Sequence, residues 1–289
     1  MAELLKGLPV AKALCERLAT RIEALAIRGC TPTLAIVRVG ERADDLAYER
    51  GATKRCESVG IAVVRHVLPA DCTQDALMDA IERVNADAGV HGCLIFRPLP
   101  AHLDEEAACA ALDPAKDVDC LTMGSLFGVV TGRAAGFPPC TAEACIELLD
   151  HYGYDLDGAR VTVVGRSLVI GKPVSLMLQA KNATVTMCHT HTLDLADECR
   201  RADILVVAAG HAGTIGADAV REGQVVVDVG INWDEEAQRL CGDVSFDEVE
   251  PIVSAITPVP GGVGSITTAV LAKHVVEAAE RSLADVSGR

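Results

Sequence analysis

Residues 161–173 read Val-Thr-Val-Val-Gly-Arg-Ser-Leu-Val-Ile-Gly-Lys-Pro, the order expected of a buried strand, a tight turn and the start of a helix. Pro173 suits the first turn of a helix, where its missing N–H group costs nothing. Such a turn presents backbone N–H groups and the positive end of a helix to phosphate groups. It is neither G-x-G-x-x-G nor a Walker A loop, because five residues separate Gly165 from Gly171 and a proline follows Lys172. The stretch predicts an α/β domain with a phosphate-binding turn; a purely structural turn is the alternative.

Apolar runs extend this pattern in both directions along the chain. In the second half, strands are predicted at residues 161–164, 184–188, 204–207 and 225–229. In the first half, strands at 34–39, 61–67 and 92–96 alternate with helices at 9–28, 44–58 and 71–85. This β-α-β order predicts parallel sheets with helices on their faces. The predicted fold class is therefore α/β, with a Rossmann-like, doubly wound parallel sheet in the second half.

A chain of 289 residues is long enough for two domains. Residues 114–141 are rich in Gly and Pro and are interpreted as the connection between the domains and one wall of a cleft. Residues 1–121 together with 266–289 are expected to form an N-terminal α/β substrate domain, onto which the last helix packs back. Residues 141–265 are expected to form the nucleotide domain, with the substrate cleft between the two.

Composition restricts the class of protein. Half of the residues are hydrophobic but only 3% are aromatic, as expected for helices packed on a parallel sheet. No apolar stretch approaches the roughly 20 residues that cross a bilayer, and the first residues lack the pattern of a signal peptide. The net charge of −15 would repel a phosphate backbone. We therefore expect a soluble cytoplasmic protein without nucleic-acid or membrane partners.

Twelve cysteines are present, but no Cys-x-x-Cys occurs. Cysteines without such spacing are expected to be small buried hydrophobic side chains. His189 and His191 would face the same way on a strand, yet no cysteine or carboxylate lies at ligand spacing from them. No metal site is expected.

The segment after the second strand of the nucleotide domain bears on the choice of cofactor. NAD-binding units often carry Asp or Glu about 20 residues after the first glycine, where it holds the ribose hydroxyls. Residues 185–191 contain no carboxylate, whereas Arg166 lies in the turn and hydroxyl and imidazole groups follow the strand. These side chains suit a 2′-phosphate, so NADP is favoured and NAD is the less favoured alternative.

Further motifs occur in a fixed order along nearly the whole chain. Those before the turn are Pro98-Leu-Pro100, Lys116-Asp-Val-Asp119 and Pro139-Cys-Thr141. Those after it are Asp228-Val-Gly-Ile-Asn232, Gly242-Asp-Val244 and Thr257-Pro-Val-Pro-Gly-Gly-Val-Gly264. Together with the turn, they closely resemble the bifunctional methylenetetrahydrofolate dehydrogenase/methenyltetrahydrofolate cyclohydrolase family. The resemblance implies two domains around a cleft, NADP on the C-terminal domain, tetrahydrofolate derivatives in the cleft, and a homodimer.

The resemblance also implies roles for individual residues. Tyr48 matches the family's pterin-side tyrosine and Asp119 its folate-binding aspartate, and these two are the catalytic candidates. Ordinary packing of Tyr48 and a turn role for Asp119 are the alternatives. The other implied substrate contacts are Pro260, Gly261 and Gly262. The implied cofactor contacts are Gly165, Arg166, Ser167, Gly171, Thr190, Gly210, Ile231 and Thr268.

Several positions depart from the family pattern, and two of them bear on proton transfer. The catalytic Tyr-x-x-x-Lys motif ends here in Ala52, and Phe96 replaces the glutamine before the Leu-Pro-Leu-Pro segment. Lys54 lies six residues after Tyr48 and would be rotated by about 240° around a helix. Strand alternation directs Arg97 to the side opposite Phe96.

These replacements remove the groups that the family uses for proton transfer. The sequence therefore predicts an NADP-dependent methylenetetrahydrofolate dehydrogenase whose cyclohydrolase step is weak or absent. Two alternatives remain open. One is a fully bifunctional enzyme with a different proton carrier, and the other is a catalytically silent paralogue that binds folate or nucleotide.

Overall fold

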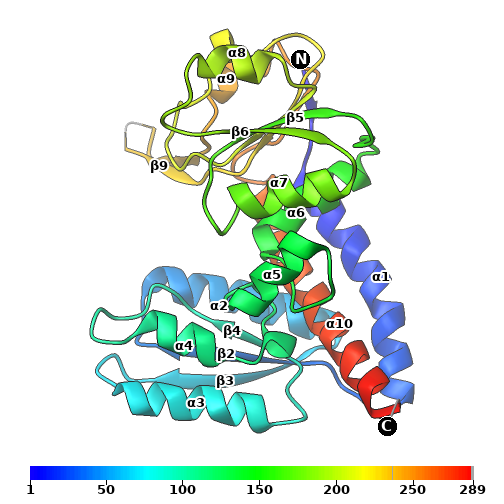
Figure 1. The fold of residues 1–289 in the computed structure, drawn as a ribbon, viewed down its shortest axis with the longest axis vertical. Helices are drawn as coiled ribbons and strands as arrows, with labels where there is room; N and C mark the ends of the chain where they lie inside the picture. Colours follow the sequence, from blue (N-terminus) through cyan, green and yellow to red (C-terminus); the bar gives the residue numbers. More distant parts are fainter. Residues whose placement is uncertain (236, 288–289) are drawn as a thin grey trace. The chain divides into compact units, whose positions relative to one another are not determined.

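The computed structural model describes residues 1–235 and 237–287 and contains two units, each assembled from separate parts of the chain (Figure 1). The C-terminal unit comprises Met1–Lys12 and Thr141–Thr267. The N-terminal unit comprises Ala13–Cys140 and the chain from Thr268 onward. Two long helices, α1 (Gly7–Ile27) and α10 (Thr267–Ser287), begin in the C-terminal unit and continue into the N-terminal one.

The N-terminal unit is built on a three-stranded parallel sheet in the order β3-β2-β4. The central strand β2 (Thr33–Val39) pairs with β3 (Ala62–Leu68) and with β4 (Gly92–Ile95). Helix α2 (Ala43–Val59) connects β2 to β3, and α3 (Gln74–Ala86) connects β3 to β4. All three strands and both helices were predicted, because their apolar spacing is regular.

Local signals in the sequence set the ends of these helices. α2 ends at Gly60, whose φ of 92° lies in the left-handed region that glycine tolerates. α3 begins after Thr73, whose hydroxyl accepts the N–H of Ala76 at 3.2 Å. Burial of the apolar face of α3 against the sheet supplies the core of this layer, which includes Val37, Leu77, Ile81 and Ile95.

The segment 114–141 is more regular than the sequence predicted. It contains the 3-10 turn η1 (Pro114–Lys116) and the helix α5 (Met123–Thr131), and it follows another unpredicted helix, α4 (Glu105–Ala111). Glycines are poor helix formers, so the glycines of α5 prevented its prediction from helix propensities. Packing explains Gly128, because a Cβ there would lie 2.1 Å from the carbonyl oxygen of Ala135.

The C-terminal unit contains a six-stranded parallel sheet in the order β1-β11-β8-β7-β5-β6. Four strands confirm the predicted runs: β5 (Arg160–Val164), β6 (Thr184–Cys188), β7 (Ile204–Val207) and β8 (Val225–Asp228). The helices are α6 (Cys140–His151), α7 (Gly171–Ala180), α8 (Leu195–Arg200) and α9 (Phe246–Val249). The 3-10 turns are η2 (Ala217–Ala219) and η3 (Val263–Ser265), and a hairpin is formed by β9 (Asn232–Asp234) and β10 (Arg239–Cys241).

The assignment of residues 1–12 to the N-terminal domain is wrong. Strand β1 (Glu3–Leu4) pairs with β11 (Ala255–Ile256), and the N–H of Gly7 donates to the carbonyl of Gly261 at 2.8 Å. These contacts place the first twelve residues in the C-terminal unit. A strand of two residues has no periodicity, so it could not be predicted from the sequence. The last helix does join the N-terminal unit, as predicted.

The cysteines match the expectation of buried thiols. All twelve are free, and nine of them are buried. In the part of the chain that the structure describes, no group of three or more His, Cys, Asp or Glu side chains could hold a metal ion. Among the same residues, no helix is both long enough and apolar enough to cross a membrane.

Candidate active site

A hollow of about 260 Å³ lies where β5, β6 and β7 end. Four of the predicted cofactor residues line it, namely Gly165, Arg166, Ser167 and Thr190. The carboxyl edge of an open parallel sheet is where α/β proteins bind their ligands. The structure therefore brings these four residues together in a suitable place for a phosphorylated ligand.

The turn after β5 depends on close backbone packing. A Cβ on Gly165 would lie 2.2 Å from the carbonyl oxygen of Ala208, and one on Gly171 would lie 2.2 Å from that of Gly165. The hydroxyl of Ser167 accepts the N–H of Ile170 at 3.1 Å and so holds the turn in shape. Side chains larger than hydrogen are excluded at both glycines.

The side chain of Arg166 is exposed at this hollow. It forms no ion pair with any residue that the structure describes, so its guanidinium is available to an anionic ligand. The imidazole of His189 and the hydroxyl of Thr190 line the same hollow. The hollow therefore offers a cation and polar side chains, and no carboxylate lines it among the residues that the structure describes.

A second hollow, of about 250 Å³, lies beside the glycine loop of the C-terminal unit. It is lined by Ile231 and by the predicted substrate residues Pro260, Gly261 and Gly262. Gly261 has a φ of 107°, and a Cβ on Gly262 would lie 2.6 Å from the carbonyl oxygen of Pro258. Glycine is therefore required at these two positions by the loop itself, before any ligand is considered.

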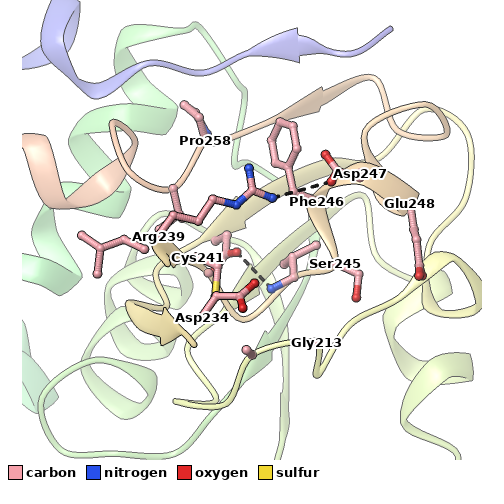
Figure 2. A pocket seen from close by; sticks show the side chains of 15 residues that line it. Gly213, Asp234, Arg239, Cys241, Ser245, Phe246, Asp247, Glu248 and Pro258 are labelled. Atoms are coloured by element: carbon pink, nitrogen blue, oxygen red, sulfur yellow. Dashed lines mark hydrogen bonds and ion pairs between the residues drawn. The ribbon is translucent and has the colours of Figure 1, made fainter. Parts of the chain in front are cut away.

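The sequence did not predict a third hollow, of about 470 Å³, between the β9–β10 hairpin and α9 (Figure 2). It shares Asp228, Leu240, Pro258 and Val259 with the second hollow. Figure 2 shows Arg239 extended toward Asp247, 3.8 Å away. Among the described residues, its lining has four carboxylates, Asp228, Asp234, Asp247 and Glu248, against this one guanidinium. Phosphate groups are therefore better accommodated beside Arg166 than here.

Asp228 organises the end of β8 from a buried position. Its Oδ1 accepts the N–H groups of Gly230 at 2.9 Å and Asp243 at 3.0 Å, and its Oδ2 accepts that of Val244 at 3.0 Å. Burial raises the pKa of Asp228 to about 6, although these three N–H donors oppose the increase. The carboxylate thus joins β8 to the segment after β10.

Asp243 is fully buried and joins two loops that carry predicted cofactor residues. Its Oδ2 accepts the N–H of Gly210 at 2.8 Å, and its Oδ1 accepts the side-chain amide of Asn232 at 2.8 Å. Gly210 follows β7, and Asn232 directly follows Ile231. The motif Gly242-Asp-Val244 stood in the sequence without a role, and the structure gives it one: it fixes both loops.

The substitution Asp243→Asn is expected to lower the free energy of unfolding by about 2 kcal/mol. An asparagine side chain has one acceptor oxygen, so its amide would face either the N–H of Gly210 or the amide of Asn232, and hydrogen bonds to charged groups contribute about 1.5–3 kcal/mol. Urea denaturation measures the change. Asp247→Asn is the matched control, since the Asp247 side chain is 86% exposed. Equal stability of the two variants would contradict this role for Asp243.

In the N-terminal unit, Tyr48 on α2 contacts Phe96 at the end of β4. Their ring centroids are 6.0 Å apart and the rings are nearly perpendicular, at 79°. Ala52 lies one turn after Tyr48 and is completely buried, and Phe96 is buried as well. The two positions that depart from the family pattern therefore present only methyl and phenyl groups.

The neighbouring cations are directed elsewhere. Lys54 is exposed and lines a separate hollow with Glu57, as its position on the helix predicted. Arg97 is exposed and lies 3.8 Å from Glu105. Arg55 donates to the hydroxyl of Thr268 at 3.5 Å within the N-terminal unit. The predicted contact of Thr268 with the cofactor stays a prediction.

Asp119 is held at the start of α6. The N–H of Cys140, the first residue of that helix, donates to Asp119 Oδ1 at 3.1 Å. Burial raises the pKa of Asp119, and the hydrogen bond from Cys140 opposes the increase. The preceding carbonyl, of Val118, accepts a hydrogen bond from Nδ1 of the buried His274 at 2.8 Å. Asp119 therefore lies in a turn and its carboxyl group is held by the first residue of α6.

Comparisons with known proteins agree with this arrangement. The family model for the catalytic domain of tetrahydrofolate dehydrogenase/cyclohydrolase matches residues 5–119, and the model for its NAD(P)-binding domain matches residues 139–283. The bifunctional protein FolD of Clostridioides difficile is 50% identical over 276 residues, which are 96% of each chain. That of Carboxydothermus hydrogenoformans is 51% identical over 281 residues, 97% of this chain and 98% of the relative.

Solved structures of similar proteins show the same fold. The bifunctional FolD enzyme of Campylobacter jejuni has a TM-score of 0.93 at 36% identity and covers 97% of this chain and 99% of its own. The FolD enzyme of Trypanosoma brucei, complexed with NADP cofactor and an inhibitor, has a TM-score of 0.89 at 36% identity and covers 98% of both chains.

The names of the Campylobacter jejuni and Trypanosoma brucei enzymes include both activities, and the other two relatives are named bifunctional. These names do not support the expectation of a weak or absent cyclohydrolase step. They agree with the two-domain α/β fold and with a dinucleotide-binding C-terminal unit. The chain belongs to the tetrahydrofolate dehydrogenase/cyclohydrolase family.

Proposed function

We propose that this protein oxidises 5,10-methylenetetrahydrofolate to 5,10-methenyltetrahydrofolate by transferring a hydride to NADP. The observation that carries the proposal is the hollow at the ends of β5, β6 and β7, where Gly165, Arg166, Ser167 and Thr190 meet. Hydride transfer needs mainly alignment of the nicotinamide against the one-carbon bridge of the folate. Tyr48 on α2 and Asp119 in the turn after η1, both in the N-terminal unit, are proposed to orient the folate.

The preference for NADP rests on charge. The exposed guanidinium of Arg166 suits a 2′-phosphate, and among the described residues no carboxylate lines the hollow to accept from the ribose hydroxyls of NAD. The Trypanosoma brucei relative, which is complexed with NADP, supports the same choice. The folate position between the two units, the homodimer and the cytoplasmic location stay predictions.

Cyclohydrolase activity is proposed to be slow in this chain. Hydrolysis of the methenyl group needs activation of water and transfer of a proton, and Ala52 and Phe96 provide neither. The second candidate is a protein with both activities, which the names of the relatives favour. That candidate needs a proton carrier other than Lys54 or Arg97, since both side chains are exposed and have acidic neighbours.

An assay that follows NADPH and methenyltetrahydrofolate separately tests the proposal on the unmodified protein. We expect NADPH and methenyltetrahydrofolate to accumulate in equal amounts, with the methenyl compound decaying at the rate of the buffer alone. Decay as fast as formation would establish the second candidate instead. Tight binding of folate and NADP without formation of NADPH would show a silent paralogue and overturn the dehydrogenase proposal.

A further inference from the structure

Asp45, in the first turns of α2, is a buried carboxylate to which the family resemblance gives no role. Its side chain is only 9% exposed, and its nearest cation is Nε of Arg42, 3.9 Å from Oδ2. Arg42 has a closer partner, Asp44, at 2.6 Å. Within the described part of the chain, no hydrogen bond reaches the Asp45 carboxylate, so its acceptor capacity is unused.

The unused oxygens of Asp45 open to space outside the protein. In the described residues, every fully enclosed side-chain nitrogen or oxygen has a hydrogen-bond partner. Since the Asp45 oxygens have none, they are not fully enclosed. Arg42 also donates to the carbonyl of Pro98 at 3.3 Å, which places the start of α2 against the loop after β4. Asp45 therefore lies at the carboxyl ends of β2 and β4, where α/β sheets bind ligands.

The other buried carboxylate of α2 is fully engaged. Glu49 accepts from Nε of Arg38 at 2.8 Å and from Nε of Arg65 at 2.9 Å. Two guanidinium groups thus neutralise Glu49, whereas no guanidinium of a described residue lies within hydrogen-bond distance of Asp45. Burial raises the pKa of Asp45, and the positive charges of Arg42 and Arg38 oppose the increase.

Asp45, Tyr48 and Ala52 are three and seven residues apart, so they share one side of the helix. The family pattern places a lysine ammonium at the last of these positions. This chain has no cation there and has a carboxylate two turns earlier. This side of α2 therefore carries a carboxylate and lacks the ammonium that the family pattern places there.

A negative charge at this position would affect the rate of the proposed reaction. The hydride leaves the methylene carbon with its electron pair and adds to C4 of the nicotinamide, and no proton is released. The positive charge of NADP⁺ disappears, and a new positive charge is shared by the two nitrogens and the carbon of the folate bridge. A fixed negative group near the bridge favours this movement of charge.

We propose that Asp45 takes part in the hydride transfer of this protein, its carboxylate stabilising through space the positive charge that develops on the folate bridge as the hydride leaves. The proposal rests on the proposed dehydrogenase function. It also accounts for slow hydrolysis, because a carboxylate that stabilises the methenyl cation makes attack by water less favourable.

The substitution Asp45→Asn tests this role, because it removes the charge and keeps the shape. We expect kcat for methylenetetrahydrofolate oxidation to fall roughly 10- to 100-fold, less than the 10²–10³ typical of a donor in direct contact with the developing charge. The KM for NADP should stay within twofold. Affinity for the cationic methenyl compound should fall more than affinity for the neutral methylene compound. Asp45→Glu keeps the charge and should retain most of the activity.

Glu57→Gln is the matched control, since it removes an exposed carboxylate of the same helix and leaves the pair of Arg42 with Asp44 intact. We expect its kinetics to equal those of the unmodified protein. A merely structural role for Asp45 predicts a lower melting temperature with an unchanged ratio of the two folate affinities, and that result would overturn the inference. So would loss of hydrolysis with intact hydride transfer, which would make Asp45 a general base. Absence of NADPH formation by the unmodified protein would refute the proposed function itself.

Discussion

The double substitution Ala52→Lys/Phe96→Gln is expected to raise the rate of methenyltetrahydrofolate hydrolysis by about 10²–10⁴-fold, the usual contribution of a positioned proton-transfer group. Position 52 lies one turn after Tyr48 on α2, and position 96 lies against the ring of Tyr48. The two changes therefore supply an amine and an amide to one site. The decay of methenyltetrahydrofolate absorbance, corrected for the buffer reaction, measures the gain.

Both substitutions are needed because Ala52 is completely buried. Ala52→Lys alone would place an ammonium near the phenyl ring of Phe96 without a polar partner, which costs stability and lowers the pKa of the amine. Phe96→Gln alone supplies an amide but no proton carrier. The two single variants are the controls, and each is expected to gain much less than the pair. Rapid hydrolysis by the unmodified protein, with no gain in the double variant, would contradict this account.

The fold was predictable wherever packing leaves a periodic trace in the sequence. The buried strand β7 and the amphipathic helix α3 have apolar spacings that fix both their type and their position. Strand β1 leaves no such trace, because two residues that pair with β11 are recognised only once the sheet exists. Helix α5 was missed for a related reason. Gly128 is unfavourable in an isolated helix and is required here by the close approach of Ala135.

The candidate site, too, was predictable only in part. The hollow at Arg166 was predictable because the turn after β5 is one continuous stretch of sequence. The role of Asp243 was not, since it depends on a contact with Gly210, 33 residues earlier. Asp45 could not be predicted either, because it is distinguished by having no hydrogen-bond partner among the described residues. No local sequence pattern reveals which carboxylate the neighbouring guanidinium groups will bind. Glu49, four residues later, takes two of them.

The substitution Arg166→Ala is expected to lower kcat/KM with NADP by about 10- to 100-fold and to leave kcat/KM with NAD nearly unchanged. A charge-assisted hydrogen bond to a phosphate contributes about 1.5–3 kcal/mol, which corresponds to this range. The guanidinium is exposed at the hollow and has no ion pair with a described residue, so the loss is not offset by the release of another partner. Steady-state kinetics with both cofactors, at one ionic strength, measure the ratio.

Arg201→Ala controls for the general loss of a positive charge from the same unit, because Arg201 is exposed and pairs with Glu198 at 2.7 Å. Its removal should change the kinetics with neither cofactor. Equal losses with NADP and NAD in Arg166→Ala would mean that Arg166 contacts the pyrophosphate common to both, and the choice of cofactor would then rest on the donors at His189 and Thr190. No loss with either cofactor would show that Arg166 binds no phosphate of NADP or NAD. The turn after β5 would then have only a structural role.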